Sequence, residues 1–306
     1  MHPEKLDGDA IQGDEPPPRA VAIDGVSRFD HREMLSLKRA HAGSPPEGHK
    51  TNTFREDVMR IGPPALTVLA CSLAVLSADC AGRHHSEGDV AADQQLAPNT
   101  LSEGQRRAGW RSLFDGGKTS GWRGYKSSDV PGGWRAVDGT LTKTGSTGDL
   151  LTKDQFGDFE LSLEWKIAPG GNAGIFYRGT EEYRHIYWSA PEYQLLDDAA
   201  APDGQNRLTA AGSAYALYPS PAGIVKPAGE WNAARIVARG AHVEHWLNGQ
   251  KLLEYELWSA DWEAKVKVSK FAAYPNYGRA ERGYIGIQGD HNGMLSLRNV
   301  RIREIR

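Results

Sequence analysis

The stretch GDLLTKDQFGDFELSLEWK, Gly148–Lys166, decides the fold of this chain. From Phe159 to Lys166, apolar and polar residues alternate without interruption. Because successive side chains of a β-strand point to opposite faces, this alternation predicts a strand with one apolar and one polar face. The polar face carries two carboxylates, a hydroxyl and an amine, which are the groups that sugar recognition or acid–base chemistry uses. One of these carboxylates is Glu164.

Short alternating runs separated by turn residues continue to the end of the chain. The dipeptides Asp138-Gly139 and Asn248-Gly249 predict type I′ hairpin turns, which need positive φ at both central residues. A helix is predicted near Asp261–Phe271, with Ser259 as its N-cap. The predicted strands are residues 134–137, 140–144, 159–167, 174–178, 192–196, 233–239, 242–247, 251–256, 283–288 and 295–305. This spacing predicts an all-β sandwich or jelly roll rather than a parallel α/β sheet.

Composition divides the chain into an N-terminal third and a packed domain. All 9 Trp lie at or after Trp110, whereas both cysteines, Cys71 and Cys80, lie before it. The domain therefore cannot use a thiol nucleophile, a disulfide or a cysteine zinc site. The net charge of −3 shows no basic excess, so we expect no nucleic-acid partner.

Four regions follow from these patterns. Residues 1–58 are rich in charge, Pro and Gly, and we expect them to be either disordered or untranslated, with Met59 as the true start. Residues 59–80 form an apolar signal or anchor segment, residues 81–108 a polar linker, and residues 109–306 the β-sandwich domain.

The apolar segment predicts export. Met59-Arg60 precedes the uncharged stretch Ile61–Ala78, which ends in small residues, as secretory signals do. Cys80 also resembles the lipidated cysteine of a bacterial lipoprotein, although Asp79 stands where that motif has a small residue. An uncleaved membrane anchor is the alternative. The expected location is periplasmic, lipid-anchored at the outer surface, or extracellular.

Several familiar catalytic motifs do not fit. Gly170–Gly174 lacks the Lys-Ser/Thr of a phosphate-binding loop, and no GxSxG motif occurs. In the run His242–His245, strand alternation places His242 and Glu244 on one face and His245 on the other, so the two histidines cannot share a metal.

Polar residues inside the predicted strands are the better candidates. Glu192 and Gln194 share one strand face. Glu164 and Glu192 either face a common cleft or lie on a solvated sheet face, and Arg235 is either a cleft residue or a surface charge. His291 lies in a loop after a strand, where functional residues gather, and an imidazole there suits an acid or a base.

The domain resembles the 3-keto-disaccharide hydrolase family over nearly all of residues 110–306. The matching segments, in family order, are Leu113–Gly116, Gly121-Trp122, Asp138–Leu141, Gly148–Glu164, Pro169–Arg178, Glu192–Asp198, Lys226–Asn232, Val243–Gly249, Ile285–His291 and Arg298–Ile302. The resemblance implies a concanavalin-A-like jelly roll, in which two antiparallel sheets stack and one presents a concave ligand face. It also implies export.

The resemblance further implies cleavage of glycosides that are already oxidised to a ketone at C3. The ketone acidifies the C2 proton, a base removes it, the C1 aglycone leaves, and water adds afterwards. This route differs from the two-carboxylate chemistry of ordinary glycosidases. The alternative function is a non-catalytic, lectin-like carbohydrate-binding module, because the same architecture hosts both.

We assign the roles of this reaction as hypotheses. Glu164 or Glu192 is the base, and His291 is the acid or a second base. The enolate stabiliser is one of Arg178, Lys226 and Arg235, and the sugar hydroxyls are bound by Asn172, Gln194 and Asp197. A divalent metal held by Glu, Asp and His of the same cleft would also stabilise an enolate.

Overall fold

The computed structural model describes residues 96–305. The predicted extension 1–58, the apolar segment 59–80 and Cys80 lie outside the described residues, so export and lipidation stay predictions. Within residues 96–305, none of the helices combines the length and apolarity needed to cross a bilayer.

Residues 96–305 fold mainly into strands, with a few short helices. The strands are β1 (Arg111–Ser112), β2 (Trp122–Gly124), β3 (Trp134–Val137), β4 (Thr140–Lys143), β5 (Leu150–Phe156), β6 (Phe159–Ile167), β7 (Asn172–Gly179), β8 (Glu192–Leu196), β9 (Asn232–Arg239), β10 (His242–Leu247), β11 (Gln250–Glu256), β12 (Gly283–Ile287) and β13 (Leu295–Glu304). The helices are α2 (Glu103–Arg107) and α3 (Ala260–Lys267), and the 3₁₀ turns are η3 (Ile186–Trp188), η4 (Pro202–Gln205) and η5 (Lys270–Ala273).

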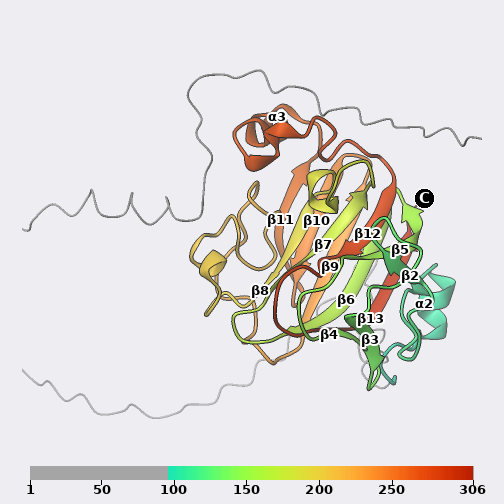
Figure 1. Cartoon of the computed structure of the whole chain (residues 1–306). Coiled ribbons are helices and arrows are strands. Elements are labelled where there is room, and N and C mark those ends of the chain that lie inside the picture. Colours follow the sequence, from blue (N-terminus) through green and yellow to red (C-terminus); the bar gives the residue numbers. More distant parts are fainter. Residues whose placement is uncertain (1–95, 306) are drawn as a thin grey trace, which may run out of the picture. The chain divides into compact units, whose positions relative to one another are not determined.

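The strands form two stacked antiparallel sheets (Figure 1). The larger sheet has the order β11-β10-β9-β6-β13-β4-β3, and β1 pairs with β13 beside it. The smaller sheet has the order β2-β5-β12-β7-β8. The predicted jelly-roll sandwich of two antiparallel sheets is confirmed.

The core lies between the sheets, and β6 shows how the sequence builds it. Phe159, Leu161, Leu163 and Trp165 are at most 1% exposed, whereas Ser162, Glu164 and Lys166 are half-buried on the outer face. On the smaller sheet, Ala173, Ile175 and Tyr177 of β7 enter the same apolar cluster. The alternation in the sequence therefore reports correctly which face of β6 is inside.

The local turn and helix signals are also confirmed. Asp138 and Gly139 have φ of 48° and 73°, and Asn248 and Gly249 have φ of 50° and 82°, as type I′ turns require. Ser259 caps α3 by accepting a hydrogen bond from the backbone N–H of Trp262. The helix ends at Lys267, earlier than predicted, and η5 follows it as a separate turn.

Strand β5 was absent from the predicted set because its exposure does not alternate. Its first three residues are all buried, the next three are exposed, and Phe156 is buried again. Leu150 packs in the core between the sheets, whereas Leu151 packs with Ile186 of η3 on the outer face. The register with β12 also shifts between Tyr284 and Gly286. A strand that is buried on both faces in its first half, exposed in its second half and irregular in register gives no period of two.

The described part of the predicted linker 81–108, residues 96–108, packs onto the domain. Asn99 and Asn299 exchange backbone-to-side-chain hydrogen bonds of 2.6 and 2.8 Å. Ser102 and Gln105 then form a capping box at the start of α2. The polar composition of this segment reflects caps and turns.

Leu163→Ala should lower the free energy of unfolding by about 2–5 kcal/mol, because it opens a cavity between the sheets. Urea denaturation of the full chain measures this loss. Glu164→Gln on the opposite face of β6 is the matched control. It should cost less than about 1 kcal/mol, since the Glu164–Arg298 ion pair is partly exposed. Equal losses in the two variants would contradict the placement of the core.

Candidate active site

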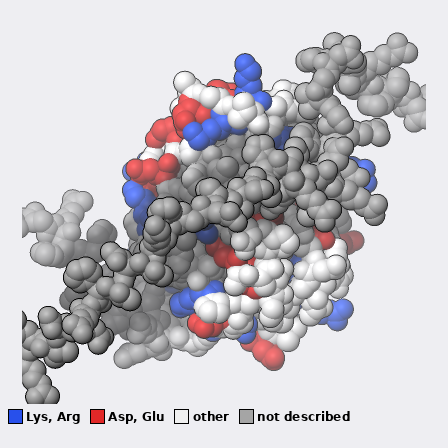
Figure 2. Space-filling view, turned by 90° about the vertical axis from the view of Figure 1, so that its left-hand side faces the viewer, with Lys and Arg blue, Asp and Glu red and all other residues white. Residues whose placement is uncertain are grey.

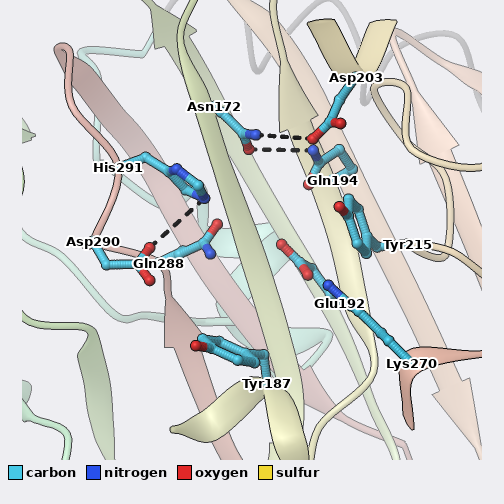
Figure 3. A pocket seen from close by; sticks show the side chains of 10 residues that line it. All are labelled: Asn172, Tyr187, Glu192, Gln194, Asp203, Tyr215, Lys270, Gln288, Asp290 and His291. Carbon is cyan, nitrogen blue, oxygen red and sulfur yellow. Dashed lines mark hydrogen bonds and ion pairs between the residues drawn. The ribbon is translucent and has the colours of Figure 1, made fainter. Parts of the chain in front are cut away.

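A polar cavity of about 230 Å³ lies on the outer face of the smaller sheet (Figure 3). Strands β7, β8 and the end of β12 form its floor, and η3, η4, η5 and two loops form its walls. Its lining residues are Asn172, Tyr187, Glu192, Gln194, Asp203, Tyr215, Lys270, Gln288, Asp290 and His291.

Glu192 is the buried carboxyl of this cavity. It is the first residue of β8, pairs with Phe176 of β7 and is only 6% exposed. The neighbouring Gly174 makes this position possible, because a Cβ there would overlap the Glu192 carboxylate. Burial raises the pKa of Glu192 from its ordinary 4.5 to about 8, against the opposing effect of Lys270. The carboxyl is thus suited to exchanging a proton near neutral pH.

Side-chain amides line the floor beside Glu192. Asn172 donates to Asp203 over 3.2 Å, and the Gln194 Nε2 donates to the Asn172 Oδ1 over 3.2 Å. The Oε1 atoms of Gln194 and Gln288 are buried and have no hydrogen-bond partner among the described residues. Because buried polar atoms are normally satisfied, these two acceptors suit the hydroxyl groups of a ligand.

Lys270 is the one Lys or Arg among the residues that line the cavity. It lies on η5, with its Nζ 4.2 Å from the centroid of the Tyr215 ring. Figure 3 shows its side chain extending toward Glu192. Burial lowers the pKa of Lys270, and the Glu192 carboxyl opposes that shift. The cavity therefore places a cation near the titrating carboxyl.

His291 lies on a loop that hydrogen bonds fix to β4 and to the segment between β4 and β5. The buried Lys143 of β4 donates from Nζ to the backbone oxygen of His291 over 2.6 Å. Ser146 donates to the Asp290 backbone oxygen, and the Gly289 N–H donates to Asp149, each over 2.8 Å. The His291 Nε2 lies 3.8 Å from the Asp290 Oδ1. An imidazole at the end of a tethered loop can transfer a proton to or from a ligand.

The structure brings four of the predicted site residues together and leaves Glu164 apart. Glu192, His291, Asn172 and Gln194 all line the one cavity. Glu164 lies on the outer face of the larger sheet, with its Oε2 2.5 Å from the Arg298 Nε. The expectation that Glu164 and Glu192 face a common cleft is therefore wrong, because β6 and β8 belong to different sheets.

The predicted cations and Asp197 also lie elsewhere, in structural contacts. Arg235 pairs with Glu160 and covers the Trp246 ring on the larger sheet, so it is not a cleft residue. Lys226 donates to the backbone oxygen of Trp231.

The other two side chains fix backbone. Arg178 is buried and donates to the backbone oxygens of Gly157 and Gly240. Asp197 accepts from the backbone N–H groups of Gly170 and Ala199. Neither lines the cavity.

Six residues line the cavity but were absent from the predicted site: Lys270, Asp203, Tyr187, Tyr215, Gln288 and Asp290. All six come from irregular segments or 3₁₀ turns, where no periodicity marks the direction of a side chain. Asp290 stands in a family-matching segment, directly before His291, and this proximity was the available signal.

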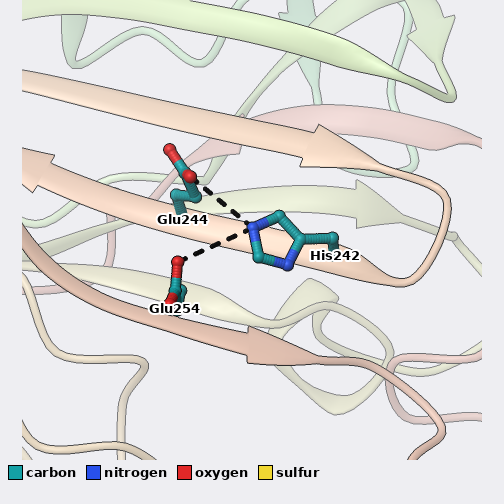
Figure 4. Close-up of side chains that lie close together, drawn as sticks. All are labelled: His242, Glu244 and Glu254. Carbon is teal, nitrogen blue, oxygen red and sulfur yellow. Dashed lines mark ion pairs between the residues drawn. The ribbon is translucent and has the colours of Figure 1, made fainter.

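Among residues 96–305, one group of side chains outside the cavity could hold a metal ion. His242, Glu244 and Glu254 bring one ligand atom each within 4.8 Å of one another on the β10–β11 hairpin (Figure 4). The group is partly exposed, and Lys251 pairs with Glu254 over 2.6 Å. As predicted, His245 points to the other face, where it is buried and lies 2.9 Å from the Tyr177 hydroxyl. Ion pairs among these charged side chains explain why they lie close together on the hairpin.

Surface charges of both signs lie side by side on the face drawn in Figure 2. Among the described residues, Lys265 pairs with Asp261 and Arg279 pairs with Glu263. This mixed pattern agrees with the nearly balanced composition.

The fold and the site together define a jelly-roll sandwich with a small polar pocket on one sheet, a class that includes carbohydrate-active proteins. The chain belongs to the family described as the 3-keto-alpha-glucoside-1,2-lyase-like domain, whose model matches residues 109–303. The family expected from the sequence is thus confirmed.

Two known proteins show the extent of the similarity. The chain is 36% identical over 182 residues to a 3-keto-disaccharide hydrolase of Bacteroides thetaiotaomicron, a match that covers 52% of this chain and 62% of that relative. A crystal structure of a proposed glycosyl hydrolase from Parabacteroides distasonis aligns with a TM-score of 0.65 and 33% identity. That alignment covers 69% of this chain and all of the other.

The raised pKa of Glu192 predicts a pH-dependent stability. The folded protein keeps this proton between pH 4.5 and about 8 while the unfolded chain loses it, so the free energy of unfolding falls as pH rises through that window. Glu192→Gln removes this loss, which amounts to at most about 5 kcal/mol. Urea denaturation at several pH values should show wild type losing stability relative to the variant. Parallel curves would show that Glu192 has an ordinary pKa.

Proposed function

We propose that this protein is a hydrolase of 3-keto-glycosides, including 3-keto-disaccharides, and that it cleaves them by elimination followed by hydration. The observation that carries the proposal is the buried Glu192 beside Lys270, in a cavity with two unpaired amide oxygens. The printed name of the Bacteroides relative supports the substrate class.

Glu192 serves as the base in this proposal. Its carboxylate removes the proton from C2 of the sugar, which the C3 ketone has acidified. A pKa of about 8 suits this step, since a base is most effective when its pKa lies near the working pH. Gly174 allows the carboxylate to lie close to the sheet, and the resulting burial makes it a stronger base than an exposed glutamate.

Lys270 serves as the enolate stabiliser. Removal of the C2 proton places negative charge on the C3 oxygen, and a nearby ammonium group in a largely buried cavity lowers the energy of that charge. Lys270 replaces Arg178, Lys226 and Arg235 in this role, because those three cations are engaged outside the cavity.

His291 completes the reaction as the acid. The enolate electrons form the C1=C2 bond as the C1–O bond breaks, and the imidazolium gives its proton to the departing oxygen. Water then adds across that bond: its hydroxyl goes to C1, its proton restores the imidazolium of His291, and the proton held by Glu192 returns to C2. The sum is hydrolysis with retention of the C3 ketone. Gln194, Gln288 and Asn172 hold the sugar hydroxyls during these steps.

A divalent metal remains a prediction. Within residues 96–305, the compact three-ligand group lies on the β10–β11 hairpin rather than in the cavity. Asp290, Asp203, Glu192 and His291 are the cavity side chains with suitable donor atoms. Assays with and without a chelator test whether turnover needs an ion.

Glu192→Gln should lower kcat/KM for a 3-keto-glucoside with a chromogenic aglycone by about 10²–10⁴-fold, because the amide cannot accept the C2 proton. Wild-type kcat/KM should rise with pH up to about 8 as Glu192 ionises, and the variant should lose this limb. Release of the chromophore by the full chain is the measurement.

Glu164→Gln is the matched control, since it removes a carboxylate from the other sheet and should leave rate and pH profile unchanged. Near-wild-type turnover by Glu192→Gln would remove Glu192 as the base. Release from the unoxidised glucoside would indicate two-carboxylate chemistry, for which Asp203 and Asp290 are available. Sugar binding without release from either substrate would favour the lectin-like alternative.

Lys270→Met should lower kcat by about 10²-fold or more with a smaller change in KM, because the enolate charge forms only after binding. Arg235→Met, which removes a cation from the outer face of the larger sheet, should leave kcat unchanged. A rise in KM at constant kcat for Lys270→Met would assign Lys270 to binding of the ground state only.

A further inference from the structure

We propose that a second cavity beside the first is the binding site for a cyclic aglycone, either a second sugar or an aromatic ring. This inference rests on the proposed function and extends it to the part of the substrate that leaves. The second cavity has a volume of about 510 Å³. Its walls come from the β2–β3 segment, the turn before β5, and the chain that precedes η3.

Two features show that the two cavities are adjacent. Asp290 lines both of them. The rings of His185 and Tyr187 stack, with centroids 4.9 Å apart and planes 12° apart, and His185 lines the second cavity whereas Tyr187 lines the first. A ligand that extends from one cavity into the other would pass along this stacked pair.

The sizes indicate which part of a glycoside lies in each cavity. The first cavity, at about 230 Å³, is smaller than the ~300–1,000 Å³ typical of ligand pockets, so it suits the one ring that is attacked. The second part of the substrate must therefore lie outside it. Asp290 precedes His291, the proposed acid, and the leaving oxygen is expected at that side. Asp290 also lines the second cavity, which places that cavity beside the leaving oxygen.

The lining of the second cavity suits a ring with an apolar face and polar edges. Tyr125, Val130, Pro131 and His185 supply flat or apolar surfaces, and Asp149 supplies a buried carboxyl. Tyr125 is held in place, because its hydroxyl donates to the backbone oxygen of Tyr183 over 2.7 Å. An amphipathic ring can pack its face on the aromatic groups and direct hydroxyls to the carboxyl.

The test compares three 3-keto-glucosides, with methyl, phenyl and glucosyl aglycones, on the full chain. His185→Ala removes part of the stacked pair, and Ser127→Trp fills the second cavity from its exposed rim. We expect each variant to lose about 10-fold in kcat/KM for the phenyl and glucosyl substrates, and less than about 2-fold for the methyl substrate. His242→Ala, an imidazole on the other sheet, is the matched control and should change none of the three.

Equal losses for all three substrates, or no loss for any, would overturn the inference while leaving the proposed function intact. If the wild-type protein cleaves none of the three, the proposed function fails, and binding of phenyl glucoside then tests the cavity alone. Contact of the phenyl protons with the wild-type protein, seen by saturation-transfer NMR and lost in Ser127→Trp, would support the site. The same contact in both proteins would overturn it.

Discussion

Strands β7 and β8 of the smaller sheet are buried on both faces, and most of the structure follows from that constraint. The inner face of this sheet packs against the larger sheet through residues such as Ile175 and Tyr193. Its outer face is covered by η3, η4, η5 and the loops around them, with Phe176 and Leu196 in two smaller apolar clusters. All five residues of β8 are buried as a result. Polar side chains on that outer face thus lie beneath other chain segments.

This double burial explains the chemistry of the site. A carboxyl on a solvated sheet would keep its ordinary pKa. The pKa of Glu192 is raised to about 8 because the covering segments exclude water from its carboxyl. The same covering segments place Lys270 in the cavity with Glu192, although the two residues are far apart in sequence. Proton abstraction needs a base whose pKa lies near the working pH, and enolate formation needs a nearby cation. The covering of this sheet face supplies both requirements of the proposed reaction.

The larger sheet provides the contrast. Its outer face also carries carboxylates and guanidinium groups, such as Glu160 with Arg235 and Arg303, and Glu164 with Arg298. These carboxylates are paired with guanidinium groups even where they are buried, as Glu160 is, and Trp231 and Trp246 lie under cations rather than under a ligand. Two strand faces with similar composition thus differ because the carboxylates of one are neutralised by ion pairs, whereas the raised pKa of Glu192 reflects burial.

The sequence by itself determined the sandwich, the inner face of β6, both type I′ hairpins, the cap of α3 and the family. The family follows from the resemblance of its motif segments, and the other features depend on local periodicity or on the conformational preference of one or two residues. It also placed Glu192 and Gln194 on one face, because strand alternation requires it.

Only the tertiary structure decided which polar face carries the candidate site. Glu164 and Glu192 look alike in the sequence, and the assignment of their strands to different sheets separates them. Likewise, Lys270, Asp203 and Tyr215 reach the cavity from 3₁₀ turns and a loop whose directions are set by tertiary packing. Long-range packing of this kind leaves no periodic signal, since the burial that perturbs Glu192 is created by residues distant in the chain.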